Sequence, residues 1–132
     1  MKQSFVEVAG TRTRIAEWRN VNNPVVLCLH GLGSTQLSFI EVAEALKNDF
    51  YLISIDLPAH GKTAPFESDV DYRIDRIAEW VNDLCIVLDI KEFYLLAHSC
   101  GGQIAMFYYS KYFENVKKRQ LIVPHHFFPV IL

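Results

Sequence analysis

The chain has 132 residues, which is enough for one domain with a single core and too few for two. Hydrophobic residues make up 51% and charged residues 21%, a balance that excludes an intrinsically disordered chain. Thirteen basic and fifteen acidic side chains give a net charge of -2, so there is no excess positive field to hold nucleic acid or an anionic membrane.

Targeting and redox signals point to the cytoplasm. No apolar run reaches signal-peptide length before Glu7, and nowhere do roughly eighteen apolar residues follow one another. The three cysteines, Cys28, Cys85 and Cys100, form no CxxC pair. Their odd number favours a reducing compartment and supports neither a disulfide framework nor a metal site. The basic cluster 117–119 is interpreted as a solvated strand entrance.

The predicted elements begin with a hairpin. Short β-like runs at 3–8 and 12–18 flank Ala9 and Gly10, where glycine tolerates the positive φ of a tight turn. The continuous apolar run VVLCLH (25–30) then predicts a strand buried on both faces, and a flexible loop follows it.

The middle of the chain alternates between helix and strand. Apolar residues at helical spacing predict a helix over 38–47, and FYLISIDL (50–57) predicts a second buried strand. A loop with two prolines and a glycine occupies 57–71. Helical spacing resumes over 74–89.

The last elements complete an α/β pattern. EFYLLAHS (92–99) predicts a third buried strand, 101–113 a helix, and RQLIVP (119–124) the start of a fourth buried strand. Strands that alternate with helices predict a mostly parallel sheet covered by helices on both faces, with the antiparallel hairpin at its N-terminal side. The fold class is therefore α/β, and such sheets carry their working groups at the carboxyl ends of strands.

Three short motifs fall at those strand ends: HGLGST (30–35), DLPAHGKT (56–63) and AHSCGG (97–102). Together with the hairpin and the order of strands and helices, they resemble the α/β-hydrolase family. The resemblance extends to about Pro124 and covers about the first half of the family's fold. Residues 1–132 are therefore expected to form a single incomplete domain, with about six of eight strands and without the lid and the acid and base residues.

The resemblance identifies Ser99 as the nucleophile. In the family a strand, a strained turn and a helix form the nucleophile elbow, usually G-x-S-x-G, which AHSCG (97–101) matches here. The positions two before and two after the serine, Ala97 and Gly101, must be small because backbone approaches closely. Ala97 departs from the usual glycine by one methyl group, and Gly102 is expected to let the helix pack tightly on the sheet.

The same resemblance implies an oxyanion hole formed by the backbone N–H groups of Leu32 and Cys100, reinforced by the helix N-terminus. The Cys100 side chain is interpreted as a packing residue rather than as a thiol activated by the helix end. His98 is expected to point away from Ser99 as a hydrogen-bonded structural histidine.

The remaining motif residues are assigned to loop architecture. His30 is expected to brace its loop by hydrogen bonds rather than to act as a general base. DLPAHGKT resembles the family's D-x-P-G-H-G-x-S stretch, with Ala59 in place of a glycine. The residues assigned to this architecture are His30, Gly31, Asp56, His60 and Gly61.

A serine hydroxyl becomes a good nucleophile only when a base takes its proton and an acid orients that base. In the family the acid and then the histidine follow the seventh and eighth strands. Downstream of Ser99 only Glu114, His125 and His126 are candidates, apart from the basic cluster. Either histidine is a possible base, although the tail is better interpreted as the start of a lid region or the end of a shortened reading frame.

The sequence predicts hydrolysis of an ester-like or other acyl bond in a small-molecule substrate, through an acyl-enzyme and without cofactor or metal. Serine rather than aspartate at position 99 argues against dehalogenase and epoxide-hydrolase chemistry. Two alternatives stay open: an inactive, truncated hydrolase that acts as a binding module, and an acyltransferase or C–C bond-cleaving enzyme. The uncovered sixth strand is expected either to promote self-association through the sheet edge or to mark a fragment of a longer polypeptide.

Overall fold

The computed structural model describes residues 1–68, 72–125 and 128–131, and side chains as far as residue 117. It begins with the predicted hairpin, strands β1 (Lys2–Val8) and β2 (Thr11–Trp18), paired antiparallel. Ala9 and Gly10 form the connection, with φ of 47° and 81°. Two successive positive φ values match the right-handed twist of the flanking strands, which explains the tight turn.

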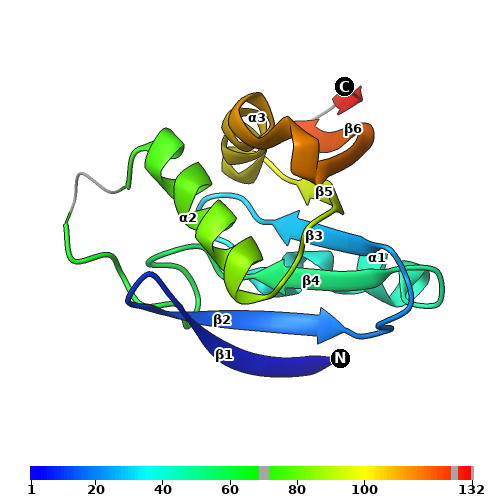
Figure 1. Cartoon of the computed structure of the whole chain (residues 1–132), viewed down its shortest axis with the longest axis horizontal. Helices are drawn as coiled ribbons and strands as arrows, with labels where there is room; N and C mark the ends of the chain where they lie inside the picture. Colours follow the sequence, from blue (N-terminus) through cyan, green and yellow to red (C-terminus); the bar gives the residue numbers. More distant parts are fainter. Residues whose placement is uncertain (69–71, 126–127, 132) are drawn as a thin grey trace.

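The hairpin leads into one sheet of order β1-β2-β4-β3-β5-β6-β7 (Figure 1). After the hairpin, the strands are β3 (Val25–Leu29), β4 (Tyr51–Ile55), β5 (Phe93–Ala97) and β6 (Val116–His125). β3 pairs in parallel with β4 and β5, and β5 pairs in parallel with β6. β2 pairs antiparallel with β4. The predicted α/β class, a mostly parallel sheet with an antiparallel hairpin at its N-terminal side, is thereby confirmed.

The C-terminal side of the sheet differs from the prediction in two respects. β6 begins at Val116, three residues before the predicted strand, and a seventh strand, β7 (Phe128–Ile131), follows it. β7 pairs antiparallel with β6 from Ile122 to His125. The backbone of the sixth strand is therefore paired along its last four residues, so the exposed edge there belongs to β7. Self-association through this side of the sheet stays a prediction.

Helices cover both faces of the sheet. On one face a 3-10 turn, η1 (Gln36–Phe39), leads into the short helix α1 (Ile40–Leu46), in place of one continuous predicted helix. On the other face α2 (Ile74–Val87) and α3 (Cys100–Tyr112) lie side by side (Figure 1), and a 3-10 turn η3 (Phe113–Asn115) follows.

Alternating side chains of β3 show why its sequence is continuously apolar. Leu27 and Leu29 are buried in the cluster beneath α2 and α3, whereas Val26 and Cys28 are buried in the cluster beneath α1. A strand covered on both faces has no polar position, as expected for an inner strand of a parallel sheet.

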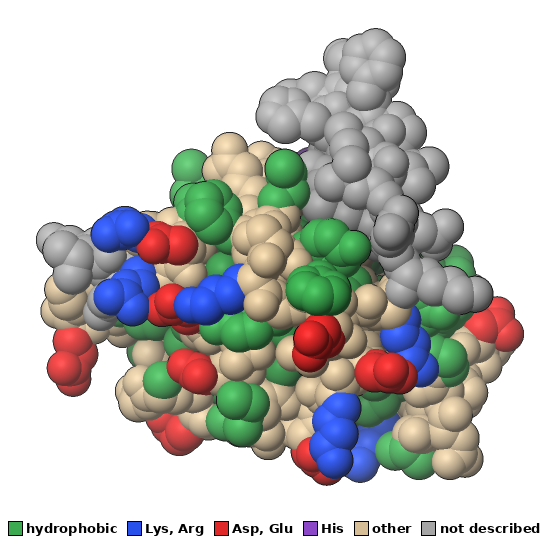
Figure 2. Space-filling view, turned by 45° about the horizontal axis from the view of Figure 1, so that its top comes forward, with side chains coloured by type: hydrophobic (Ala, Val, Ile, Leu, Met, Phe, Trp, Pro, Cys, Tyr) green, Lys and Arg blue, Asp and Glu red, His purple; other side chains and the backbone are tan. Residues whose placement is uncertain are grey.

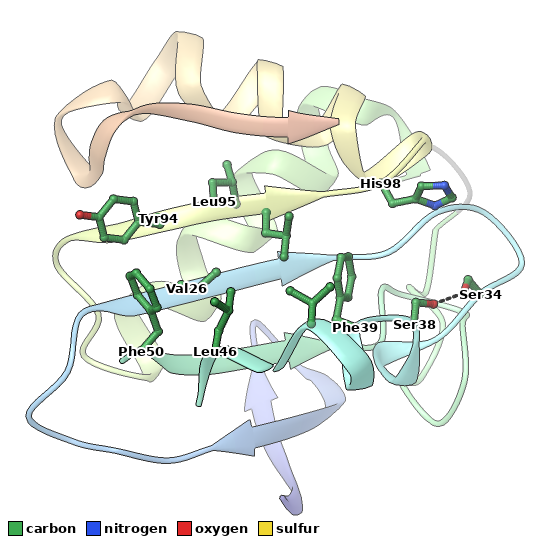
Figure 3. A pocket seen from close by; sticks show the side chains of 11 residues that line it. Val26, Ser34, Ser38, Phe39, Leu46, Phe50, Tyr94, Leu95 and His98 are labelled. Atoms are coloured by element: carbon green, nitrogen blue, oxygen red, sulfur yellow. Dashed lines mark hydrogen bonds between the residues drawn. The ribbon is translucent and has the colours of Figure 1, made fainter. Parts of the chain in front are cut away.

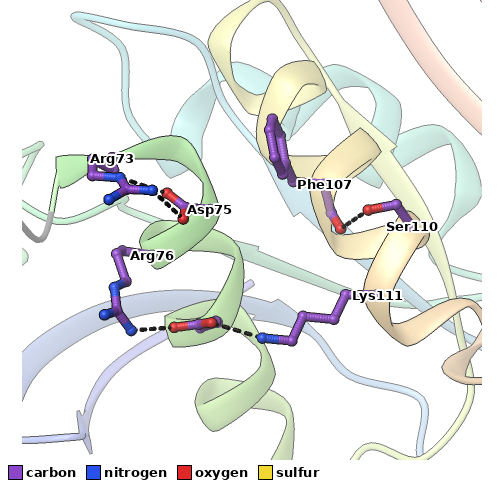
Figure 4. Close-up of polar contacts among 7 residues, drawn as sticks. Arg73, Asp75, Arg76, Phe107, Ser110 and Lys111 are labelled. Carbon is purple, nitrogen blue, oxygen red and sulfur yellow. Dashed lines mark hydrogen bonds and ion pairs between the residues drawn. The ribbon is translucent and has the colours of Figure 1, made fainter.

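The seam between α2 and α3 combines buried and exposed contacts. Tyr108 of α3 is fully buried, with its ring centroid 5.6 Å from that of Phe93. On the surface, Glu79 of α2 accepts hydrogen bonds from Lys111 at 2.7 Å and from Arg76 at 2.8 Å (Figure 4). Exposed ion pairs stabilise little, so packing around Tyr108 holds the two helices together.

The surface carries charges of both signs. Figure 2 shows Lys and Arg side chains interspersed with Asp and Glu on the face in view, without a continuous region of one sign. None of the helices in the described ranges combines the length and the apolar character needed to cross a bilayer.

Candidate active site

Ser99 occupies the turn between β5 and α3 in a backbone conformation that side chains rarely adopt. Its φ is 52° and its ψ is -119°. Ser99 is the N-cap residue of α3, where a serine normally accepts a hydrogen bond from a backbone amide of the first turn. Here the side chain makes no capping hydrogen bond. The turn thus carries strain of about 1–3 kcal/mol and leaves the hydroxyl unused by the helix.

Close backbone packing explains the small residues around Ser99. A Cβ added to Gly101 would lie 2.2 Å from the carbonyl oxygen of Leu29 and 2.6 Å from that of His30. Ala97 is fully buried and pairs with Leu29. The end of β3 therefore leaves no room for a side chain at position 101.

The first turn of α3 leaves one amide available. The N–H of Gly101 donates to His98 O at 2.9 Å, and the N–H of buried Gly102 donates to Ser99 O at 2.8 Å. Gln103 N–H also reaches Ser99 O, at 3.4 Å. Cys100 N–H is the remaining donor of this turn and has no acceptor in the described part of the chain. This N–H lies at the N-terminal end of α3, where the helix dipole carries partial positive charge.

The loop after β3 lies directly against the elbow. A Cβ added to Gly31 would lie 3.0 Å from Ser99 Cβ and 3.0 Å from His98 Nδ1. The N–H of Ser34 donates to Gly31 O at 3.2 Å and closes a turn with Leu32 near its tip. The Leu32 side chain is 78% exposed, and its N–H has no acceptor among the described residues. The fold thus places both predicted oxyanion donors on segments that meet at Ser99.

His30 joins two loops at the carboxyl edge of the sheet. It is fully buried, its Nδ1 lies 2.7 Å from Gly31 O, and its Nε2 accepts the N–H of Leu57 at 3.0 Å. Nδ1 must then carry the proton, because only an unprotonated Nε2 can accept. Burial lowers the pKa of the imidazole. Both ring nitrogens are engaged, so His30 has none free to act as a base on Ser99.

Asp56 anchors the loop after β4. Its Oδ1 accepts the N–H of Gln36 at 2.7 Å, and its Oδ2 accepts the N–H of Lys62 at 2.9 Å. Gly61 has a φ of 53°, and a Cβ there would lie 2.2 Å from Asp56 Oδ2. Nδ1 of His60 lies 3.0 Å from a backbone carbonyl of the same loop. The carboxylate thus ties the DLPAHGKT loop to the start of η1.

The predicted structural role of His98 is wrong. Its side chain is exposed and has no hydrogen-bond partner among the described residues. Figure 3 shows it at the end of β5, beside the loop that follows β3.

The Cys100 thiol is a weak candidate for chemistry. Partial burial raises its pKa, which keeps it protonated at neutral pH. It is one of three free cysteines, and burial also raises the pKa of Cys85 to about 12. The packing interpretation therefore fits this environment better than an activated thiol.

The described residues place no hydrogen-bonded base at the Ser99 hydroxyl. No histidine or carboxylate described here hydrogen-bonds to its hydroxyl. Glu114 lies in η3 at the far end of α3, one helix length or about 20 Å away. His125 ends β6 at the same sheet edge as Ser99, but its side chain lies outside the described residues, as does all of His126.

An apolar groove opens beside His98 on the α1 face (Figure 3). It has a volume of about 620 Å³, with apolar walls from η1, α1, β3 and β5. Ser34, Ser38 and His98 form its polar end, where the two serine hydroxyls are hydrogen-bonded. The sequence signal for this groove is Tyr94 and Leu96 of β5, which predict a covering element on this face; both are only half-buried beside η1 and α1.

Comparison with known proteins identifies a family. A family model described as the alpha/beta hydrolase fold matches residues 24–131. A human serine hydrolase-like protein is 29% identical over 80% of this chain and 52% of its own length. Human monoacylglycerol lipase ABHD6 is 30% identical over 78% of this chain and 31% of its own length. The chain therefore spans about half or less of these curated relatives.

Solved structures show the same architecture. A membrane phospholipase A superposes with a TM-score of 0.85 at 24% identity, over 92% of this chain and 38% of its own. An epoxide hydrolase from Vigna radiata superposes with a TM-score of 0.84 at 25% identity, over 92% of this chain and 39% of its own. The agreement extends across nearly all of this chain and less than half of each neighbour.

Proposed function

Because the chain belongs to the α/β-hydrolase fold family, we propose that it carries the nucleophile and oxyanion hole of a serine hydrolase that cleaves acyl bonds through an acyl-enzyme. One observation supports the proposal most directly. Ser99 occupies a strained turn at the N-cap of α3, and its hydroxyl takes no part in capping. Strained backbone clusters at active sites, and a strained turn that leaves a serine hydroxyl without a capping role supports a reactive role for that hydroxyl.

Each residue at the elbow has a distinct role in this proposal. Ser99 Oγ attacks the acyl carbon, and the carbonyl oxygen becomes an oxyanion. The N–H groups of Leu32 and Cys100 donate to that oxyanion, and as main-chain groups they do not titrate. Removal of one such donor typically costs about 2.7–4 kcal/mol of transition-state stabilisation.

The proton of Ser99 requires a base, and no described residue is hydrogen-bonded to the hydroxyl as that base. His30 is engaged at both nitrogens, Nδ1 of His60 is held by its own loop, and His98 has no hydrogen-bond partner among the described residues that would orient it as a base. A hydrolase of this kind without its base and acid is expected to lose about 10⁴ to 10⁶ in turnover. A Ser99 elbow and oxyanion hole without base and acid are therefore expected to react with strongly activated probes rather than to turn over substrate.

The relatives support an ester as the substrate class. Monoacylglycerol lipase, by its name, acts on an acyl ester, and the serine hydrolase-like protein is named for a serine nucleophile. The epoxide hydrolases among the structural neighbours share the fold. A serine at the elbow favours the acyl route over their chemistry, because a serine that opened an epoxide would form an ether that water does not cleave, whereas its attack on an acyl carbon forms an ester that water does cleave.

A fluorophosphonate probe tests the proposal. We expect labelling of the folded chain, with the adduct mapped by mass spectrometry to the peptide that contains Ser99 and lost in Ser99→Ala. Ser110→Ala is the matched control, since Ser110 is an exposed serine of the same helix. Equal labelling of Ser99→Ala, or none of the wild type, would favour a binding module without a reactive serine. Product analysis with an added alcohol acceptor separates hydrolysis from acyl transfer.

A further inference from the structure

The peptide between Gly31 and Leu32 links His30 to the oxyanion hole. The carbonyl of Gly31 and the N–H of Leu32 belong to one trans peptide, so they point in opposite directions. Two donors hold this carbonyl: His30 Nδ1 at 2.7 Å and Ser34 N–H at 3.2 Å. Whatever fixes the carbonyl direction also fixes the direction in which Leu32 N–H points.

The neighbouring strand decides which nitrogen of His30 carries the proton. A neutral imidazole has one donor and one acceptor nitrogen. Leu57 N–H points at Nε2 from the loop after β4, and that loop is anchored by the hydrogen bond from Asp56 N–H to Arg14 O. Nε2 therefore stays unprotonated, and the proton on Nδ1 is available to Gly31 O.

We propose that His30 is a positioning residue whose neutral Nδ1–H tautomer, selected by Leu57 N–H, aims the Leu32 amide at the oxyanion. The importance of this amide for catalysis rests on the proposed function. The hydrogen-bond relay from Leu57 through His30 to the Gly31–Leu32 peptide is independent of the proposed function.

Protonation of His30 would break this relay. An N–H at Nε2 would face the N–H of Leu57 within a fully buried site, and neither group would have an acceptor. The titratable groups that face the ring are His60, with its centroid 5.1 Å away, and Asp56. Burial is the largest influence on the His30 pKa and lowers it; His60 lowers it further, while the bond to Gly31 O and Asp56 raise it.

The relay is tested by following amide and imidazole signals by NMR as the pH is lowered. We expect Nδ1 protonated and Nε2 unprotonated at neutral pH. On acidification, the amide signals of Leu57 and Leu32 should shift with the same midpoint as His30 Nε2, and they should do so in His60→Gln as well. The proposal would be overturned if the Leu32 amide signal did not shift as His30 titrates, or if it shifted with the midpoint of His60 instead.

Two substitutions of His30 separate its two bonds. Asparagine places an amide N–H near the position of Nδ1 and keeps the donor to Gly31 O, whereas glutamine reaches the position of Nε2 and keeps only the acceptor for Leu57. Fluorophosphonate labelling of Ser99 should stay within about tenfold of wild type in His30→Asn and fall by about 10² to 10³ in His30→Gln, the loss expected for one oxyanion donor.

The outcomes of the two experiments are distinct. Equal labelling rates in folded His30→Asn and His30→Gln would overturn the positioning role. Absence of labelling in the wild type, together with a Leu32 amide that follows His30, would remove the proposed function and leave the relay intact. The wild-type titration does not depend on either variant, so it decides the proposal even where a substitution prevents folding.

Discussion

Replacing Ser99 with glycine is expected to stabilise the fold relative to Ser99→Ala. Both variants lack the hydroxyl, so their difference reports the backbone at φ 52° and ψ -119°. A non-glycine residue in such a conformation costs about 1–3 kcal/mol. Glycine adds about 0.5–1 kcal/mol of chain entropy to the unfolded state. The net gain for Ser99→Gly is therefore about 0–2.5 kcal/mol, centred near about 1 kcal/mol.

Urea denaturation measures this difference. The midpoint should rise in Ser99→Gly relative to Ser99→Ala with an unchanged slope, because both unfold the same surface. Ser110→Gly, within the same helix and at ordinary helical φ, is the control and should lose a few tenths of a kcal/mol. A Ser99→Gly variant less stable than Ser99→Ala would show that the turn stores less strain than the entropy cost of glycine, and backbone strain would then no longer support a reactive Ser99.

Three further changes test the structure around the elbow. Gly101→Ala should cost about 3 kcal/mol or more in thermal or urea unfolding, because its Cβ would lie 2.2 Å from Leu29 O and neither backbone can yield; a loss below about 1 kcal/mol would contradict this packing. Ala59→Gly should stabilise the fold by about 1 kcal/mol, since Ala59 has a φ of 61°; a lower urea midpoint would show that this loop conformation is wrong. The stability of the wild type should fall on acidification below about pH 6.5, because burial lowers the pKa of His30 in the folded chain and the unfolded chain therefore binds the proton at a higher pH. The slope should be at most about 1.4 kcal/mol per pH unit for one proton. His30→Asn should remove this part of the pH dependence, and an unchanged profile would assign it to other groups.

Local patterns of apolar residues predict most of the helices and strands of the fold. Strand and helix positions follow from apolar runs and helical spacing, and the small residues on both sides of Ser99 mark a turn where backbone meets backbone. The spacing predicted a helix over 38–47, yet the chain forms the 3-10 turn η1 before α1. Thr35 accepts Leu37 N–H and Asp56 holds Gln36 N–H, so capping and a distant carboxylate decide how this helix begins.

By itself, the sequence determined the order of elements, the α/β class and the candidate nucleophile, because burial of one or both faces imposes a local periodicity. Only the tertiary structure decided which groups meet around Ser99. His30 and Leu57 are 27 positions apart, and their hydrogen bond exists because β3 and β4 are parallel neighbours in register. The exposure of His98 and the pairing of β7 likewise depend on which elements cover each face and edge. Such contacts arise from strand order, which no local spacing of residues encodes.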